Sequence, residues 1–312
     1  MKRAAIVTAL ADNEIGRLVE DLMLTGGLDT TCVRWVPYDG IGRSVRNGLN
    51  FTERGFGVRV AVGVSDRANT AISQLGPTDV DWDALFSRGV RWFHTGGIFA
   101  GLSDSTAEVA ETAMAAAQRH GTVVSYDLNY RPSLWEALGG ATRAREVNMQ
   151  LARHVDVMIG NLGQLAAFLD VDDVGPGGEV DNDPSDDDGP VQRAIIERLA
   201  TADPNFRVIA GTLRSEHSAT INGWGAVGWS RGEGVAEATY RDGLEILDRV
   251  GGGDSFASGL AYGLMEFASL HDGLEYGAAH GALAMTTPGD TSMATLAEVE
   301  QLVRGTSARA VR

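Results

Sequence analysis

The chain has 312 residues, of which 44% are hydrophobic, and a formal net charge of −16 at pH 7. This length is enough for one large α/β domain or two small ones, and the apolar content is ordinary for a soluble enzyme. The negative charge argues against nucleic-acid binding, because no basic stripe is available to neutralise phosphates. No run of apolar residues approaches the roughly 18 that a membrane span needs, and the stretch at the start of the chain is too short for a signal peptide. The single cysteine, Cys32, agrees with a reducing compartment, so we expect a cytoplasmic protein.

Hydrophobic periodicity predicts strands and helices that alternate along most of the chain. The expected buried strands are residues 4–10, 90–94, 123–127, 157–160 and 208–211. The expected helices are residues 12–24, 103–120, 142–154, 191–202, 255–267, 274–285 and 296–303. Polar-alternating stretches at 47–53 and 57–64, and a late hairpin of 218–221 with 227–230, complete the prediction. This order indicates a mostly parallel sheet with helices on both faces and a ligand site at the carboxyl ends of its strands.

An acidic segment interrupts this pattern. The stretch from Asp170 to Gly189 carries nine acids and no positive charge. Such a composition cannot bury a core, so we expect an acidic loop over residues 170–190.

Three consecutive glycines and an acid precede the helix expected from residue 255. The backbone of Gly251, Gly252 and Gly253 is free to adopt dihedrals closed to other residues. Their amides would lie at a helix N-terminus, which suits a phosphate or a transferring phosphoryl group. Asp254 could accept a proton from a hydroxyl that attacks that group. The alternative is a glycine-rich turn that caps a helix, with Asp254 as a surface acid.

A second polar constellation follows the strand expected at 123–127. Asp127, Asn129 and Arg131 alternate, so their side chains share one face if the chain is still extended there. An acid, an amide and a guanidinium at a strand end suit the recognition of phosphate or of a sugar acid. The alternative is an internal Asp–Arg pair that stabilises a turn.

The Gly-Gly-Gly-Asp segment resembles the C-terminal signature of the ribokinase-like (PfkB) sugar kinases. Together with the Asp-x-Asn-x-Arg-Pro-x-Leu-Trp run of residues 127–135, it resembles the 2-keto-3-deoxygluconate kinase branch of that family. The resemblance covers nearly the whole chain. It implies one ribokinase-like kinase domain over residues 1–312, with residues 45–65 as the remnant of a small β lid.

The resemblance also implies roles for particular residues. Asp254 would be the catalytic base and would contact the substrate, helped by the amides of Gly251, Gly252 and Gly253. Arg67 and Arg131 would bind the substrate. The residues implied in ATP binding are Asn129, Arg131, Asn161, Thr212, Gly251, Gly253 and His280. ATP and Mg²⁺ are the implied cofactors, and no protein ligand of the metal is assigned.

The chain also departs from the family pattern. The family's first strand, part of its lid sheet and its Gly-Gly-x-x-x-Asn-Val-Ala sugar-binding motif are missing, which predicts either a start further upstream or an amino-terminally truncated enzyme. Gln164 stands where the family has a glutamate that helps to order magnesium.

Three functions therefore stay open. The first is an ATP-dependent kinase that phosphorylates a primary hydroxyl of a sugar acid, with 2-keto-3-deoxygluconate as the expected substrate. The second is a kinase of the same class for a neutral sugar such as fructose or ribose, and the third is a non-catalytic binding remnant of the fold. In each case the partners are small molecules, with no nucleic acid or membrane. The resemblance to the family also implies that a homodimer can form by pairing of lid strands.

Overall fold

A seven-stranded sheet forms the centre of the computed structural model, which describes residues 3–168, 189–202 and 205–305. Its strand order is β10-β9-β8-β7-β6-β5, and β11 also pairs with β9. The strands are β5 (Trp92–Gly96), β6 (Val123–Asp127), β7 (Val157–Ile159), β8 (Val208–Glu216), β9 (Ile221–Ser230), β10 (Gly234–Glu237) and β11 (Arg241–Glu245). Strands β5 to β8 are parallel, and β9 to β11 extend the sheet in antiparallel fashion.

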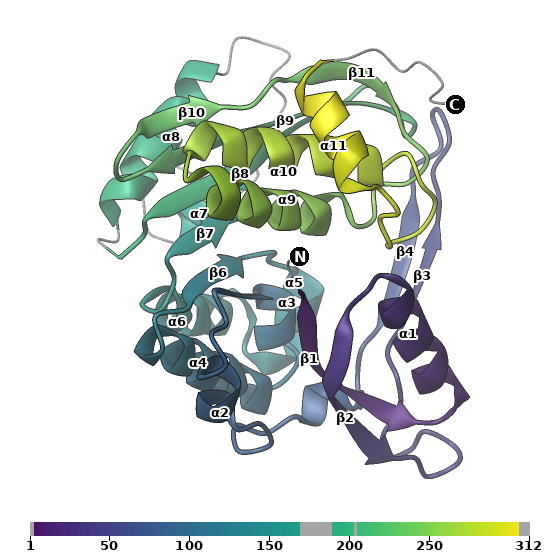
Figure 1. Cartoon of the computed structure of the whole chain (residues 1–312). Helices are drawn as coiled ribbons and strands as arrows, with labels where there is room; N and C mark the ends of the chain where they lie inside the picture. The colour runs from purple at the N-terminus through teal and green to yellow at the C-terminus, as the bar shows by residue number, and fades with distance from the viewer. Residues whose placement is uncertain (1–2, 169–188, 203–204, 306–312) are drawn as a thin grey trace.

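Helices cover both faces of this sheet (Figure 1). One face carries α9 (Gly252–Phe267) and α10 (Leu270–Ala284). The other carries α4 (Asp104–Arg119), α6 (Gly140–Ala152), α7 (Leu162–Phe168) and α8 (Gly189–Ala202). Alternation along β7 shows the two layers, because Val157 and Ile159 pack with Phe256 of α9, whereas Met158 packs in the other core. The predicted α/β architecture with helices on both faces is confirmed.

The described amino-terminal part forms a separate layer. Strands β1 (Ala5–Asp12) and β2 (Asp29–Pro37) pair in parallel and carry α1 (Glu14–Thr25). A hairpin of β3 (Leu49–Glu53) and β4 (Val62–Asp66) follows. Asn47 connects the two units, because its buried side chain accepts the N–H of Ala11 over 2.9 Å.

Shorter helices complete the described chain: α2 (Trp82–Phe86), α3 (Gly97–Ala100), α5 (Pro132–Trp135), α11 (Leu296–Val303) and the 3₁₀ turns Ile72–Gln74 and Glu136–Leu138. None of the helices among the described residues is long and apolar enough to cross a membrane.

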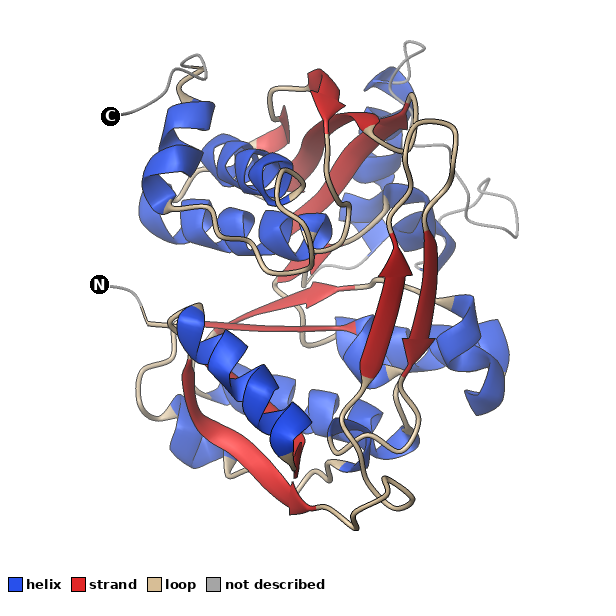
Figure 2. Cartoon of the chain, turned by 90° about the vertical axis from the view of Figure 1, so that its right-hand side faces the viewer, coloured by secondary structure: helices blue, strands red, loops and turns tan. Residues whose placement is uncertain are grey.

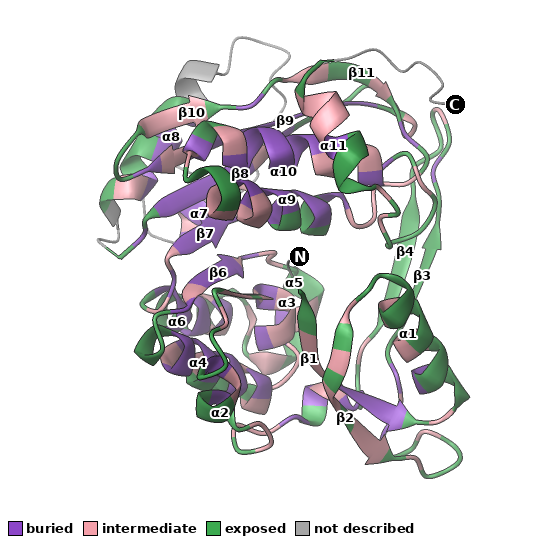
Figure 3. Cartoon of the chain, in the orientation of Figure 1, coloured by how far each residue is buried: buried purple, intermediate pink, exposed green. Residues whose placement is uncertain are grey.

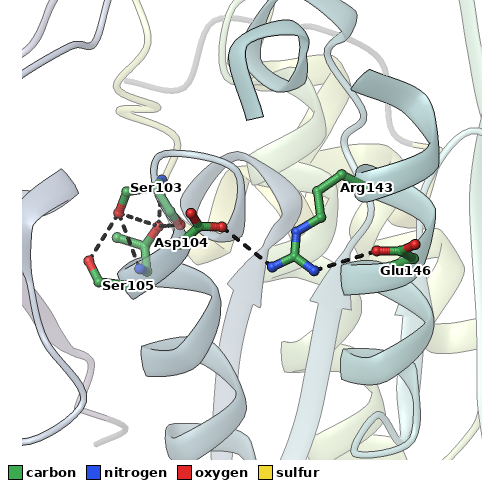
Figure 4. A network of polar contacts seen from close by, with 6 residues as sticks. Ser103, Asp104, Ser105, Arg143 and Glu146 are labelled. Atoms are coloured by element: carbon green, nitrogen blue, oxygen red, sulfur yellow. Dashed lines mark hydrogen bonds and ion pairs between the residues drawn. The ribbon is translucent and has the colours of Figure 1, made fainter. Parts of the chain in front are cut away.

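A polar network joins the start of α4 to α6 (Figure 4). The hydroxyl of Ser103 caps α4 in a capping box with Thr106. Arg143 of α6 bridges Asp104 at 3.4 Å and Glu146 at 3.5 Å. These contacts satisfy amides at the start of α4 and connect the two helices that support the strands of the site.

Three sequence predictions need comment. The late hairpin is wrong, because β8 and β9 pair over their full lengths and residues 218–221 lie largely in the turn between them. The start of β9 was not predicted, because its glycines interrupt the pattern of apolar residues. These glycines make room for a tyrosine, since a Cβ at Gly223 would lie 1.9 Å from the hydroxyl oxygen of Tyr240. Strand β2 was not predicted. The acidic loop over 170–190 lies outside the described residues, apart from Gly189 and Pro190 at the start of α8.

Candidate active site

Helix α9 begins with glycines that expose backbone amides. Gly251 is its N-cap, with φ 81° and ψ −6°, and a Cβ there would lie 2.9 Å from the carbonyl oxygen of Asp290. Both the left-handed backbone and the close approach require glycine. Within the described chain, the amides of Gly253 and Asp254 have no hydrogen-bond acceptor. Free amides at the positive end of a helix suit a negatively charged ligand.

A cavity of about 1180 Å³ opens beside the start of α9. It lies at the carboxyl ends of β6 and β7 and along the last half of β8, where ligands of α/β sheets bind. The hairpin β3–β4 adds Asn50 and Ser65 to the lining and is seen in front of the sheet in Figure 2. The predicted site residues that line the cavity are Arg67, Asn129, Arg131, Asn161, Thr212, Gly251, Gly253 and Asp254.

Two aspartates line this cavity. Asp127 ends β6, and Asp254 lies in the first turn of α9. Burial, and then the charge of Asp254, raise the pKa of Asp127 to about 7, against the opposing effects of the Asn129 N–H and the Arg131 charge. A pair of acids in which one is driven toward its protonated form is a frequent arrangement where a proton has to be moved.

The chain leaves β6 in a tight turn. Asn129 has φ 33°, and its N–H donates to Oδ1 of Asp127 over 3.2 Å. Asparagine tolerates this left-handed conformation better than most residues. The condition for a shared face of Asp127, Asn129 and Arg131, a chain that is still extended after β6, is therefore not met. All three nevertheless line the cavity, because the turn keeps the segment at the edge of the sheet.

Two arginines, Arg67 and Arg131, bring positive charge to the cavity. Among the described residues neither guanidinium has a hydrogen-bond or ion-pair partner. Burial and the charge of Arg131 both lower the pKa of Arg67, so the two positive groups affect each other. Two unpaired guanidinium groups in one cavity favour an anionic ligand, because guanidinium binds carboxylate and phosphate with paired donors.

A second charged group lines the cavity along β8. Thr212, Arg214 and Glu216 alternate on this strand and therefore share a face. Nη2 of Arg214 lies 2.7 Å from Oε1 of Glu216, and Nη1 of Arg249 lies 2.6 Å from the same oxygen. Only Thr212 of these residues was predicted. The available signal was the Thr-x-Arg-x-Glu alternation, which continues the strand beyond Gly211, where we expected it to end.

Asn161 and Gln164 line the cavity at the end of β7. Oδ1 of Asn161 accepts the N–H of Gln164 over 3.0 Å, so this side chain holds the start of α7. Among the described residues no cluster of three or more histidine, cysteine, aspartate or glutamate side chains could hold a metal ion. A divalent ion in the cavity would therefore have few protein ligands.

Two predicted residues do not line the cavity. The amide of Gly252 donates to the carbonyl of Arg249 over 3.3 Å. The Nδ1 and Nε2 atoms of His280 lie 2.9 Å and 3.0 Å from the hydroxyls of Ser258 and Ser292, and burial lowers the pKa of the ring. The roles of Gly252 and His280 stay predictions.

Comparison with known proteins agrees with this geometry. The profile of the pfkB family carbohydrate kinases matches residues 225–296. A 2-dehydro-3-deoxygalactonokinase of Haloferax volcanii is 28% identical over 97% of this chain and 82% of its own length. A 5-dehydro-2-deoxygluconokinase of Geobacillus kaustophilus is 26% identical over 96% of this chain and 79% of its own length. The crystal structure of a 2-dehydro-3-deoxygluconokinase from Thermotoga maritima is 32% identical, with a TM-score of 0.83 over 96% of this chain and 85% of that one.

The fold and the similarity to these proteins define the class of protein as a carbohydrate kinase. Its cavity contains a helix N-terminus with free amides, next to the carboxylate of Asp254. This confirms the expected enzyme class, for which ATP is the implied phosphoryl donor. The chain belongs to the pfkB family of carbohydrate kinases.

Proposed function

We propose that this chain transfers the γ-phosphoryl group of ATP to a primary hydroxyl of a small sugar acid of the 2-dehydro-3-deoxy type. The observation that carries the proposal is the pair of guanidinium groups of Arg67 and Arg131, which have no ion-pair partner in the part of the chain that the structure describes and line the same cavity as Asp254. A carboxylate held by the two arginines would place the rest of the sugar chain toward Asp254. The relatives described above bear the names of kinases for such acids, which supports this substrate class.

The chemistry follows from the start of α9. Asp254 accepts the proton of the substrate hydroxyl while that oxygen attacks the γ-phosphorus, and the bond from the γ-phosphorus to the bridging oxygen of ADP breaks. Backbone amides at Gly251 and Gly253 stabilise the negative charge of the transferring group. Mg²⁺ supplies further neutralisation of the phosphates and would be held mainly by phosphate oxygens and water, given the few carboxylates in the cavity.

A substrate panel tests the proposal. ADP release would be measured with MgATP and, in turn, 2-dehydro-3-deoxygluconate, 2-dehydro-3-deoxygalactonate, 5-dehydro-2-deoxygluconate, fructose and ribose. We expect turnover with one or more of the acids and none with the neutral sugars. Arg67→Ala should raise the KM of the acid about tenfold or more, because a charge-assisted pair is lost, and should leave the KM of ATP within about twofold.

Asp254→Asn is the control for chemistry. It should lower kcat by about 10²–10⁴-fold, while the affinity for ATP stays within about twofold. Turnover of fructose as fast as that of any acid would contradict the proposed substrate class. Binding of ATP and acid without any turnover would instead indicate a non-catalytic member of the fold.

We also propose a homodimer that forms through the outer face of β3–β4. Phe51 and Val64 are paired in register on that face, with 63% and 59% of their surface exposed, whereas Asn50 and Ser65 on the other face line the cavity. Both strands of the hairpin are exposed (Figure 3). A two-stranded hairpin with an exposed apolar face is stabilised when that face is buried against another surface. The same face of a second copy of the chain would provide such a surface. We further propose a cytoplasmic location, where Cys32 stays reduced.

A further inference from the structure

Four arginines line the cavity, and the proposed carboxylate contact uses only two of them. Arg67 and Arg131 are sufficient for one carboxylate, so the proposed function assigns no ligand to Arg214 and Arg249. A surplus of two guanidinium groups needs an explanation in a chain of net charge −16, where positive side chains are scarce.

Glu216 holds these two arginines in one cluster. Both guanidinium groups bind its Oε1, at 2.7 Å from Arg214 and 2.6 Å from Arg249. Nη2 of Arg249 also donates to the carbonyl of Ser218 over 3.2 Å. Because one carboxylate faces two guanidinium groups, the cluster keeps a net positive charge and unused N–H donors.

The electrostatic environment agrees with this account. Burial lowers the pKa of Arg214, helped by the charges of Arg249 and Arg131, while Glu216 opposes the change. Burial acts to raise the pKa of Glu216, but the hydrogen bond from Arg249 and the two positive charges outweigh it and lower the pKa. Positive charge is thus concentrated here against its own repulsion, which an anionic ligand would relieve.

The position of the cluster indicates which anion this is. Arg214 is two residues beyond Thr212 on one face of β8, and Arg249 is two residues before Gly251 at the start of α9. The two guanidinium groups therefore come from the end of β8 and from the residues just before the free amides of α9. A triphosphate carries several charges along its length and can contact all these donors, whereas a carboxylate carries one charge and already has Arg67 and Arg131.

We propose that Arg214 and Arg249, aligned by Glu216, form the binding subsite for the phosphate chain of the nucleotide. This inference rests on the proposed function, because it assumes that the other two arginines take the sugar acid. Glu216 is a positioning residue that keeps the two guanidinium groups together in the absence of nucleotide.

The test separates binding of nucleotide from binding of acid. Arg214→Ala and Arg249→Ala would be compared with wild type by calorimetric titration of ATP in the absence of sugar, and by the KM of each substrate. Each substitution should weaken ATP binding about tenfold or more, because a charge-assisted contact is lost, and should leave the KM of the acid within about twofold. Arg214→Lys should fall between wild type and Arg214→Ala, because charge remains and the paired donors do not.

Arg193→Ala is a matched control. Arg193 of α8 pairs with Glu237 at 3.0 Å, with side-chain exposures of 50% and 47%, close to the 46% and 47% of Arg214 and Glu216. It removes the same charge outside the cavity and should leave ATP affinity unchanged. Circular dichroism melting would verify that each variant is folded.

Three results would overturn the inference: a loss confined to the KM of the acid, unchanged ATP affinity in folded Arg214→Ala and Arg249→Ala, or an equal loss in Arg193→Ala. Because the titration requires no turnover, a wild-type chain that binds ATP through these arginines yet phosphorylates no sugar would refute the proposed function alone.

Discussion

The surroundings of Asp127 change the acidity of its carboxyl group. Burial and the neighbouring Asp254 raise its pKa to about 7, so its carboxyl group loses a proton near neutrality rather than near pH 4. Asp254, in the first turn of α9, is the more exposed of the two and remains the proposed base. We expect Asp127 to act by holding the turn at Asn129 and by its charge toward Asp254.

The raised pKa predicts a pH-dependent stability. Between about pH 4 and 7 the folded state holds the Asp127 proton while the unfolded state has released it, so the stability contributed by this group is lost as the pH rises through that interval. Asp127→Asn should remove this loss, stabilising the protein by about 1–3 kcal/mol at pH 8 and by little near pH 4. Urea unfolding at several pH values would measure the difference, and curves for wild type and variant that stay parallel from pH 4 to 8 would contradict it.

At the residue scale, the sequence could group cavity residues that are close together in the chain. Gly251, Gly253 and Asp254 are adjacent, and Asn129 and Arg131 belong to one short run, so their shared location at the cavity could be anticipated. Arg214, Glu216 and Arg249 could not be grouped in the same way. Their contact depends on β8 continuing to Glu216 and on the chain returning to it 33 residues later.

At the scale of elements, the hairpin β3–β4 has two chemically different faces. Its inner face presents Asn50 and Ser65, joined by a hydrogen bond of 2.8 Å, and its outer face presents Phe51 and Val64. All ten residues of the two strands are exposed. Such a ribbon is marginally stable alone, so its order depends on what binds against it.

Substrate binding should therefore stabilise this hairpin. We expect amides of residues 49–53 and 62–66 to exchange with solvent more slowly, by about tenfold or more, when the sugar acid is added, because it contacts Arg67 and the inner face. ATP alone should have a smaller effect here and a larger one at the start of α9. Hydrogen exchange followed by mass spectrometry would check this, and acid-induced protection confined to α9 would speak against a lid.

The elements that sequence patterns missed have identifiable causes. Strand β9 carries glycines beneath Tyr240, so its packing comes from a residue outside the strand. Strand β2 has half-buried residues on both faces and shows no clean alternation. By contrast, β6 and β7 are largely buried, and their sequences are short apolar runs. Because such runs are typical of buried parallel strands, the existence and order of these two strands could be predicted.

For the whole molecule, the outer face of β3–β4 predicts association. Sedimentation should show a dimer for wild type, and Phe51→Ser with Val64→Ser should shift it to monomer, because both side chains leave water in the proposed contact. Ile41→Ser is the control, since Ile41 is 68% exposed and lies outside the hairpin. A wild-type monomer at the highest concentration measured, or a dimer that persists in the double variant, would rule out this contact.

The residues of the cavity are divided unequally along the chain. Arg67 and Arg131, assigned to the acceptor, precede residue 132, whereas Arg249 and Gly251 to Asp254, assigned to phosphoryl transfer, lie within the 225–296 segment that matches the family profile. We therefore expect acceptor choice to depend mainly on the earlier segment and phosphoryl transfer mainly on the later one. A chimera that takes residues 45–67 from a kinase for another sugar would keep Asn129 and Arg131, for which ATP binding is also expected, together with the start of α9. This shorter segment is therefore the natural unit for redirecting the enzyme to a new acceptor.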